Sequence, residues 1–362
     1  MQAILIVKTS AIGDVIQTLD VLSYLRARFP HAQIDWVVES GIAPLLNAHP
    51  LISRVLTTHF KAWRKAPFSK RTRAEFEAFC HELRRTRYDV LFDLQANSKS
   101  ALITLLANAE VKVGYDWKGV KEKTNLLVTH VKYPADLSGG VRQKYIQLVK
   151  DHFKDGAETK AQGTSLKLLD AERQRLEALC GEAVLQKRPR LMVAMGSKWE
   201  NKRLSHATLL SFLRLIDQHY SPAFVFIYAD AEEQKLAQGC LSVFPSQSIA
   251  VGELSLPLWQ GLMAQMDGVI TVDSAALHLC GTTATPSFSV FGPSLASIYK
   301  PLGSQHATFQ GECPYDERFA IRCPKLRTCS TGACMKEISS QKLFEAFQAW
   351  ANSNFLSVTT SM

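Results

Sequence analysis

Residues 3–19 read AILIVKTSAIGDVIQTL, a short apolar run followed by a polar loop and then a helical pattern. The run Ala3–Val7 has the length of a buried strand. From Val15 to Leu25 the apolar residues recur at helical spacing, and Phe29-Pro30 closes the pattern, which predicts one helix. A strand that leads through a loop into a helix is the unit from which parallel sheets are built. The stretch therefore predicts an α/β fold.

The same alternation recurs along the whole chain. Between Pro134 and Arg190 the sequence becomes polar and turn-rich, which predicts a domain boundary near residues 155–165. We expect two Rossmann-like domains with parallel sheets facing each other across a cleft, over residues 1–160 and 161–340, followed by a C-terminal helix and tail over 341–362. Further strands are predicted at residues 34–38, 88–94, 190–195, 224–228, 268–272 and 286–291.

Composition narrows the class of protein. The 362 residues are 46% hydrophobic and 21% charged, which is typical of a globular protein and excludes a disordered, collagen-like or coiled-coil chain. No apolar run reaches the ~18 residues of a membrane span, and the first residues lack a signal-peptide pattern, so we expect a cytoplasmic protein. The formal net charge of +9 favours anionic partners, which include nucleic acids, phosphate-bearing ligands and an acidic membrane surface.

The loop KTSAIGD, residues 8–14, follows the first predicted strand. Ligands of open parallel sheets bind beyond the carboxyl ends of the strands, so this loop is a candidate for the binding cleft. Neither a GxGxxG fingerprint nor a GxxxxGK[ST] loop is present. Asp14 has two interpretations that the pattern does not separate: an acid that caps the helix, or a general base at the mouth of the sheet.

Two segments of the second half are candidates for anion binding. In VDSAALH, residues 272–278, a strand passes directly into a helix whose N-terminus favours an anion, although Asp273 and Ser274 could simply be caps and His278 structural. The loop GSKWENKR, residues 196–203, could clamp a diphosphate or be a solvated basic loop.

Two further segments are unusual in composition. FKAWRKAPFSKRTR, residues 60–73, holds six basic residues and no acid, which is typical of a solvated face but also of a surface for nucleic acid or anionic lipid. Four cysteines lie close together near the C-terminus, with reduced thiols as the expectation and a zinc or iron–sulfur site as the alternative. We predict no metal site there. These cysteines are Cys313, Cys323, Cys329 and Cys334.

Taken together, the motifs resemble the lipopolysaccharide heptosyltransferases of glycosyltransferase family 9, with heptosyltransferase I as the most similar branch. The resemblance extends over nearly the whole chain, in consistent order and spacing. The segments that carry it are ILIVKTSAIGDVIQTL, IDWVVES, WRKAPFS, YDVLFDLQANSKSA, GYDW and VITVDSAALHLCGTTATPSFSVFGPS.

The resemblance implies a GT-B enzyme whose first domain binds the acceptor and whose second binds a nucleotide sugar. It implies inverting, metal-independent transfer of L-glycero-D-manno-heptose from ADP-heptose to the Kdo region of the lipopolysaccharide inner core, without a cofactor. The acceptor is then Kdo-lipid A, met at the cytoplasmic face of the inner membrane. Alternatives are a heptosyltransferase II or III, or a family member that uses another nucleotide sugar. A nucleic-acid-binding protein would leave the second-half loops without a role, so we expect no nucleic-acid partner.

The resemblance also implies roles for individual residues. Asp14 matches the proposed general base of the family, which favours catalysis over capping. The positions that match donor-binding residues are Ser197, Lys202, Glu232, Asp273, Ser274, Ala275 and His278. The positions assigned to acceptor binding are Ser10, Trp63, Arg64, Lys65 and Lys99. Both implied substrates are anionic, which accounts for the positive net charge.

Overall fold

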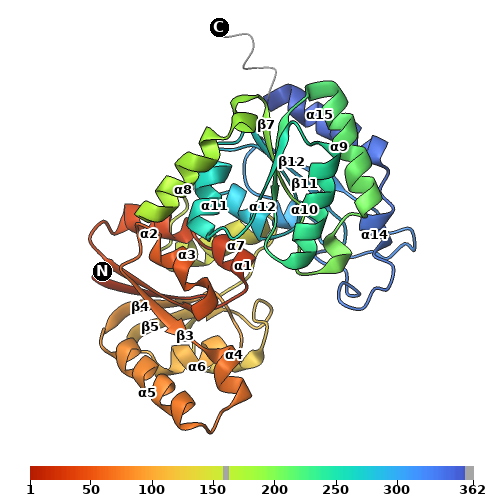
Figure 1. Cartoon of the computed structure of the whole chain (residues 1–362). Coiled ribbons are helices and arrows are strands. Elements are labelled where there is room, and N and C mark those ends of the chain that lie inside the picture. Colours follow the sequence, from red (N-terminus) through yellow and green to blue (C-terminus); the bar gives the residue numbers. More distant parts are fainter. Residues whose placement is uncertain (158–162, 355–362) are drawn as a thin grey trace. The chain divides into compact units, whose positions relative to one another are not determined.

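The computed structural model describes residues 1–157 and 163–354, and the chain divides into two compact units, Met1–Gln162 and Gly163–Met362 (Figure 1). Each unit contains one parallel six-stranded sheet. The strand orders are β3-β2-β1-β4-β5-β6 and β12-β11-β10-β7-β8-β9. In both, the first strand of the unit lies in the centre and the chain builds one half of the sheet before the other, as in a Rossmann fold. The prediction of two Rossmann-like domains is confirmed.

In the first unit, strands alternate with helices on both sides of the sheet. Side chains of β1 such as Leu5 and Val7 pack against α4, α5 and α6, which lie on one side, while α2 and α7 lie on the other (Figure 1). The elements are β1 (Ala3–Val7), α1 (Ile12–Ile16), α2 (Asp20–Arg28), β2 (Gln33–Glu39), α3 (Ala43–Asn47), β3 (Arg54–Thr58), α4 (Phe60–Lys65), α5 (Lys70–Arg84), β4 (Tyr88–Asp93), α6 (Ser98–Leu106), β5 (Ala109–Tyr115), β6 (Val131–Tyr133) and α7 (Gly140–His152), with short 3-10 turns at η1 (Ser40–Ile42) and η2 (Lys123–Leu127).

The second unit repeats this plan and ends in a helix that completes its core. Phe347 of the last helix packs edge-on against Phe212, with ring centroids 5.7 Å apart. The elements are α8 (Asp170–Gly181), η3 (Ala183–Gln186), β7 (Arg190–Ala194), η4 (Glu200–Lys202), α9 (His206–Tyr220), β8 (Ala223–Ile227), α10 (Ala231–Val243), β9 (Ser248–Val251), α11 (Leu256–Met263), β10 (Gly268–Val272), α12 (Ala275–Cys280), β11 (Ser287–Phe291), α13 (Ala296–Tyr299), β12 (His306–Gln310), α14 (Ala333–Lys336) and α15 (Ser340–Asn354).

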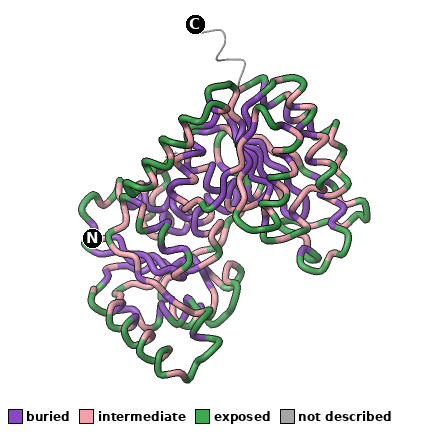
Figure 2. Tube along the Cα trace, in the orientation of Figure 1, coloured by how far each residue is buried: buried purple, intermediate pink, exposed green. Residues whose placement is uncertain are grey.

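The central strands form the buried part of each unit (Figure 2). All five residues of β1 and all five of β10 are buried, as continuous apolar runs require when helices cover both faces of a sheet. Among residues 1–157 and 163–354, none of the helices combines the length and hydropathy that crossing a membrane demands.

The structure has two helices where the sequence predicted one. The pattern after the first loop predicted a single helix up to Phe29, but α1 ends at Ile16 and α2 begins at Asp20. Between them the backbone changes to i→i+3 hydrogen bonds, and the Thr18 hydroxyl donates to the carbonyl of Asp14 at 2.7 Å. A hydroxyl that bonds back to the preceding turn bends a helix, which apolar periodicity does not reveal.

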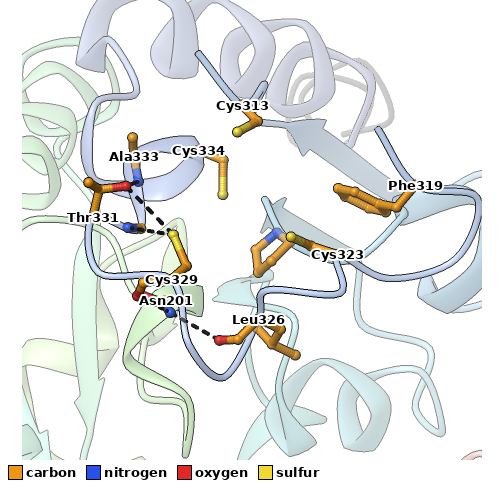
Figure 3. Close-up of a pocket in the computed structure, with 11 residues that line it drawn as sticks. Asn201, Cys313, Phe319, Cys323, Leu326, Cys329, Thr331, Ala333 and Cys334 are labelled. Carbon is orange, nitrogen blue, oxygen red and sulfur yellow. Dashed lines mark hydrogen bonds between the residues drawn. The ribbon is translucent and has the colours of Figure 1, made fainter. Parts of the chain in front are cut away.

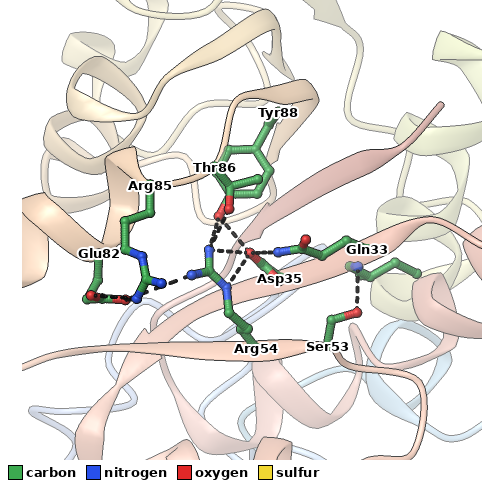
Figure 4. Close-up of polar contacts among 9 residues, drawn as sticks. Gln33, Asp35, Ser53, Arg54, Glu82, Arg85, Thr86 and Tyr88 are labelled. Atoms are coloured by element: carbon green, nitrogen blue, oxygen red, sulfur yellow. Dashed lines mark hydrogen bonds and ion pairs between the residues drawn. The ribbon is translucent and has the colours of Figure 1, made fainter.

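An ion pair at a buried carboxylate links three strands of the first sheet, β3, β2 and β4 (Figure 4). The Arg54 guanidinium on β3 donates to the Asp35 carboxylate on β2 at 2.7 Å, and the Tyr88 hydroxyl on β4 donates to the same oxygen at 2.8 Å. Asp35 is fully buried, so removal of either partner would leave a charge or a polar group without compensation. These contacts fix the sheet and lie at the ends of the strands remote from the candidate site.

Candidate functional site

Each sheet has one position at which the strand order reverses, between β1 and β4 in the first unit and between β7 and β10 in the second. Open α/β sheets bind ligands beyond the carboxyl ends of the strands at this switch point. In the first unit Asp14 follows β1. In the second, Lys202 follows β7 and Asp273 follows β10. These three residues therefore follow the carboxyl ends of the central strands of their own sheets, and their roles stay predictions.

Asp14 lies in the first turn of α1 and is half-buried. Its Oδ2 atom accepts a hydrogen bond from the backbone N–H of Ala11 at 3.4 Å, which is longer than an ordinary hydrogen bond. The carboxylate thus makes the contact expected of a capping acid, but a weak one. The geometry is compatible with both interpretations of Asp14, and its catalytic role stays a prediction.

The loop between β1 and α1 is held by a residue that the sequence did not single out. The side-chain oxygen of Gln95, just after β4, accepts hydrogen bonds from the backbone N–H groups of Thr9 at 3.2 Å and Ser10 at 3.1 Å. The backbone N–H of Gln95 in turn donates to Asp93 at 3.0 Å. Gln95 therefore ties the segment after β4 to the loop after β1, and Ser10 belongs to the loop that it holds.

Lysines from three segments surround this loop. Lys8 is fully buried, and its Nζ donates to the Tyr145 hydroxyl at 2.9 Å. Burial lowers the pKa of Lys8 to about 7, the Asp14 carboxylate opposes this, and Lys121 and Lys144 add to it. Burial also lowers the pKa of Lys144 to about 8, with a further contribution from Lys121. Lys8, Lys121 and Lys144 therefore form a cluster of amines, and Lys8 and Lys144 interact electrostatically with Asp14. Local sequence patterns did not reveal this cluster.

The predicted acceptor residues of the basic segment differ in exposure. Trp63 on α4 is buried, and its indole Nε1 donates to Glu75 at 3.0 Å. Arg64 and Lys65, beside it, are exposed. Lys99 on α6 is also exposed, and its Nζ lies 5.7 Å from the ring centre of Phe60 on α4. The structure therefore brings Lys99 next to the basic helix α4. The buried side chain of Trp63 anchors that helix to the rest of the unit.

In the second unit, three predicted donor residues meet around one carboxylate. Asp273 and Lys202 are both buried and form an ion pair, and the Ser294 hydroxyl donates to the same carboxylate. His278 Nε2 lies 3.7 Å from the other carboxylate oxygen. Burial by itself would raise the pKa of Asp273, but Lys202 and His278 outweigh it and hold the pKa below its ordinary value.

The remaining predicted residues at this edge are placed by the backbone. Ser197 is buried, and its carbonyl accepts a hydrogen bond from the Arg203 side chain at 2.8 Å. Ser274 is the N-cap residue of α12, with its hydroxyl 3.4 Å from that of Thr271. Ala275 is the first residue of α12 and is half-buried. Ser197 lies in the loop that carries Lys202, and Ser274 and Ala275 directly follow Asp273.

A pocket of about 550 Å³ lies beyond the carboxyl ends of β7 and β8. Among its lining residues are Gly196, Arg203, Glu232 and Glu233. Arg203 and Glu232 form an ion pair across it at 2.7 Å, and a Cβ atom at Gly196 would overlap the Glu233 carboxylate. Of the predicted donor residues only Glu232 lines this pocket. Gly196 begins the candidate loop 196–203 but was not singled out, and Glu233 was not predicted as a site residue. Their contact depends on the approach of α10 to the loop after β7, which the local sequence does not show.

Comparison with known proteins shows which family the chain is related to. The family model described as glycosyltransferase family 9 (heptosyltransferase) matches residues 76–327. Lipopolysaccharide heptosyltransferase 1 of Escherichia coli K12 is 42% identical over 120 residues, which cover 33% of this chain and only 37% of that protein. Its namesake from Pseudomonas aeruginosa is 26% identical over 298 residues, or 80% of this chain and 79% of the relative.

The fold agrees with these sequence matches. The solved structure of E. coli heptosyltransferase WaaC with ADP superposes with a TM-score of 0.79, covers 97% of this chain and all of its own, and is 22% identical in sequence. This confirms the predicted GT-B architecture. Since the family model spans well over half of the chain, the protein belongs to glycosyltransferase family 9, the heptosyltransferase family.

Proposed function

We propose that the protein is an inverting, metal-independent glycosyltransferase that moves L-glycero-D-manno-heptose from ADP-heptose to the Kdo region of the lipopolysaccharide inner core. The observation that carries the proposal is the position of Asp14, in the first turn after the central strand of an acceptor-type domain, in a chain of the heptosyltransferase family. Each substrate would be bound at the switch point of one sheet.

Asp14 is the general base in this proposal. Its carboxylate takes the proton of the acceptor hydroxyl while the oxygen attacks the anomeric carbon from the face opposite the leaving ADP, so that configuration inverts. Lys8 and Lys144 both interact electrostatically with Asp14, and their amines favour an anionic acceptor at this place. Kdo carries a carboxylate, which suits these amines.

The second unit supplies the donor site. The pocket lined by Arg203 and Glu232 has the size of a small-ligand site, and we assign it to the nucleoside part of ADP-heptose. The departing diphosphate would lie at the neighbouring Ser197–Ser274 edge. Lys202 already pairs with Asp273. In this proposal it therefore holds the loop that carries Ser197 in position and also stabilises the negative charge on the departing diphosphate.

The acceptor is anchored in a membrane, and the basic helix α4 is our candidate for the contact. Arg64 and Lys65 are exposed, and Phe68, which follows them, is 96% exposed. Exposed basic residues beside an exposed aromatic ring suit the surface of an anionic bilayer. We propose peripheral association with the cytoplasmic face of the inner membrane.

A heptosyltransferase of type 2 or 3 is the second candidate. Curated relatives with these names match at 25% identity (Salmonella typhimurium, type 2) and 23% identity (E. coli, type 3) over more than four-fifths of the chain. The reaction would be the same, but the acceptor would already carry heptose.

The test is release of ADP from ADP-heptose with and without Kdo-lipid A, for the wild-type protein and Asp14→Asn. We expect release that depends on the acceptor and disappears in the variant, while ADP binding by calorimetry is unchanged. Wild-type activity only with a heptosylated acceptor would select the second candidate. An Asp14→Asn rate within a few-fold of wild type would refute the assignment of the base.

A further inference from the structure

Four cysteines of the second unit surround one small cavity. Cys313, Cys323, Cys329 and Cys334, hereafter the cysteine cluster, line a cavity of about 30 Å³ between the segment after β12 and helix α14. Figure 3 shows the thiols of Cys323, Cys329 and Cys334 directed into the same space. All four are free thiols and half-buried. The remaining walls are largely apolar, with Leu326 and Phe319 among them.

The sulfur atoms share one side of the cavity wall with a backbone donor. The backbone N–H of Gly332 donates to Cys329 Sγ at 3.4 Å, which orients that sulfur. Four cysteine sulfur atoms around one cavity are the donor set that a single thiophilic cation takes.

We propose that the cysteine cluster binds one thiophilic metal ion, Zn²⁺ or Fe²⁺, through four thiolates. Tetrahedral coordination by four cysteines is the usual structural site for these ions. Within residues 1–157 and 163–354, no three His, Cys, Asp or Glu side chains already stand in a metal-binding arrangement. Binding therefore draws the sulfur atoms into the cavity, to about 2.3 Å from zinc, and releases the thiol protons. This departs from our prediction of no metal.

The site would have a structural task, because the cysteine cluster holds the loop after β7. Asn201 Nδ2 donates to the carbonyls of Leu326 at 3.0 Å and Cys329 at 2.9 Å. Lys336 forms an ion pair with Glu200 at 2.7 Å. These contacts flank η4, which carries Lys202. A metal that locks the cysteine cluster would thus keep the loop with Ser197 and Lys202 in place, and would take no part in the transfer itself.

The first test measures bound metal in the full chain, purified without oxygen from cells grown with added zinc or added iron. We expect about one metal ion per chain in the wild type, as a four-cysteine site binds, and at least tenfold less in Cys323→Ser and Cys329→Ser. Cys180→Ser, which changes a half-buried cysteine outside the cluster, is the matched control and should keep the metal. The element found in the two preparations distinguishes zinc from iron.

The second test guards against serine variants that fail to fold. The wild-type protein is stripped of metal and titrated with Co²⁺, and a thiolate-to-cobalt charge-transfer band that saturates at one ion per chain supports the site. Cys329→His, which keeps a ligand atom, should retain the band. Wild-type protein that is metal-free from both media and gives no band overturns the proposal. So does alkylation without reduction that finds the cysteine cluster paired in disulfides. Neither readout depends on the transferase reaction, so failure here leaves the proposed function standing.

Discussion

The side chains of Lys202 and Asp273 pair in the interior of the second unit, with 8% and 6% of their surfaces exposed. They come from the loop after β7 and from the end of β10, which are neighbours in the sheet although 71 residues separate them in sequence. The ion pair joins the two halves of the sheet at the switch point.

Breaking this pair should destabilise the fold as well as impair donor binding. Asp273→Asn leaves Lys202 buried without a counter-charge, and we expect unfolding free energy to fall by about 3–5 kcal/mol in a urea titration. Glu232→Gln, which removes the exposed partner of Arg203, should cost less than about 1 kcal/mol. The double variant Lys202→Met/Asp273→Leu should be more stable than Asp273→Leu alone. Equal losses in the Asp273 and Glu232 variants would contradict the importance of burial.

Lys8 should make stability depend on pH. Burial lowers its pKa from the ordinary value of 10.5 to about 7, so between these pH values the unfolded chain binds more protons than the folded one. The cost of burying Lys8 is therefore full below pH 7 and is lost as the pH rises towards 10. The stability advantage of Lys8→Met should shrink by about 3 kcal/mol from pH 6.5 to 9.5. Exposed Lys123→Met is the control, and a pH-independent difference for Lys8→Met would refute the assignment.

The lack of a side chain at Gly196 should be necessary for nucleotide binding in the proposed donor pocket. A methyl group there overlaps the Glu233 carboxylate, so Gly196→Ala must displace that side chain. We expect ADP affinity to fall about tenfold, measured by calorimetry, which corresponds to about 1.4 kcal/mol. Gly196→Ala/Glu233→Ala should recover most of the affinity because the overlap is removed. Unchanged binding in the single variant would argue that the nucleoside lies outside this pocket.

Charge reversal on α4 should affect only the acceptor side. Arg64→Glu/Lys65→Glu should weaken binding to anionic lipid vesicles and raise the KM for Kdo-lipid A, both more at low salt than at high salt. ADP binding should be unchanged. Lys167→Glu/Arg173→Glu, two exposed basic positions of the second unit, provides a change of equal net charge. A similar loss of vesicle binding in that control would mean that net charge, and not α4, is responsible.

The central part of each sheet could be predicted because its strands are apolar on both faces. β1, β4, β7 and β10 all appear in the sequence as short apolar runs. The edge strands β3, β6, β9 and β12 were not predicted, and neither was β5, since these strands are only partly buried and lack such runs. The break between α1 and α2 depends on a single hydroxyl, which hydrophobic spacing does not register.

The sequence predicted where the candidate site lies, but only some of the residues that form it. A loop after a central parallel strand lies at the binding edge whatever its sequence, which located Asp14 and Asp273. The contacts of Gln95 with the first loop and of Tyr145 with Lys8 join residues 85 and 137 positions apart. Nothing in the local pattern of either segment indicates its partner, so these residues were found only in the folded chain.

The two hydrogen bonds that Asn201 donates have a consequence for biosynthesis. The carbonyls that accept them belong to Leu326 and Cys329, more than 120 residues further along the chain. During translation the first unit can fold as soon as it leaves the ribosome, whereas the loop that carries Lys202 waits for the last tenth of the polypeptide. A nascent chain stalled before Leu326 would hold a finished first unit and a second unit whose loop after β7 still lacks these contacts.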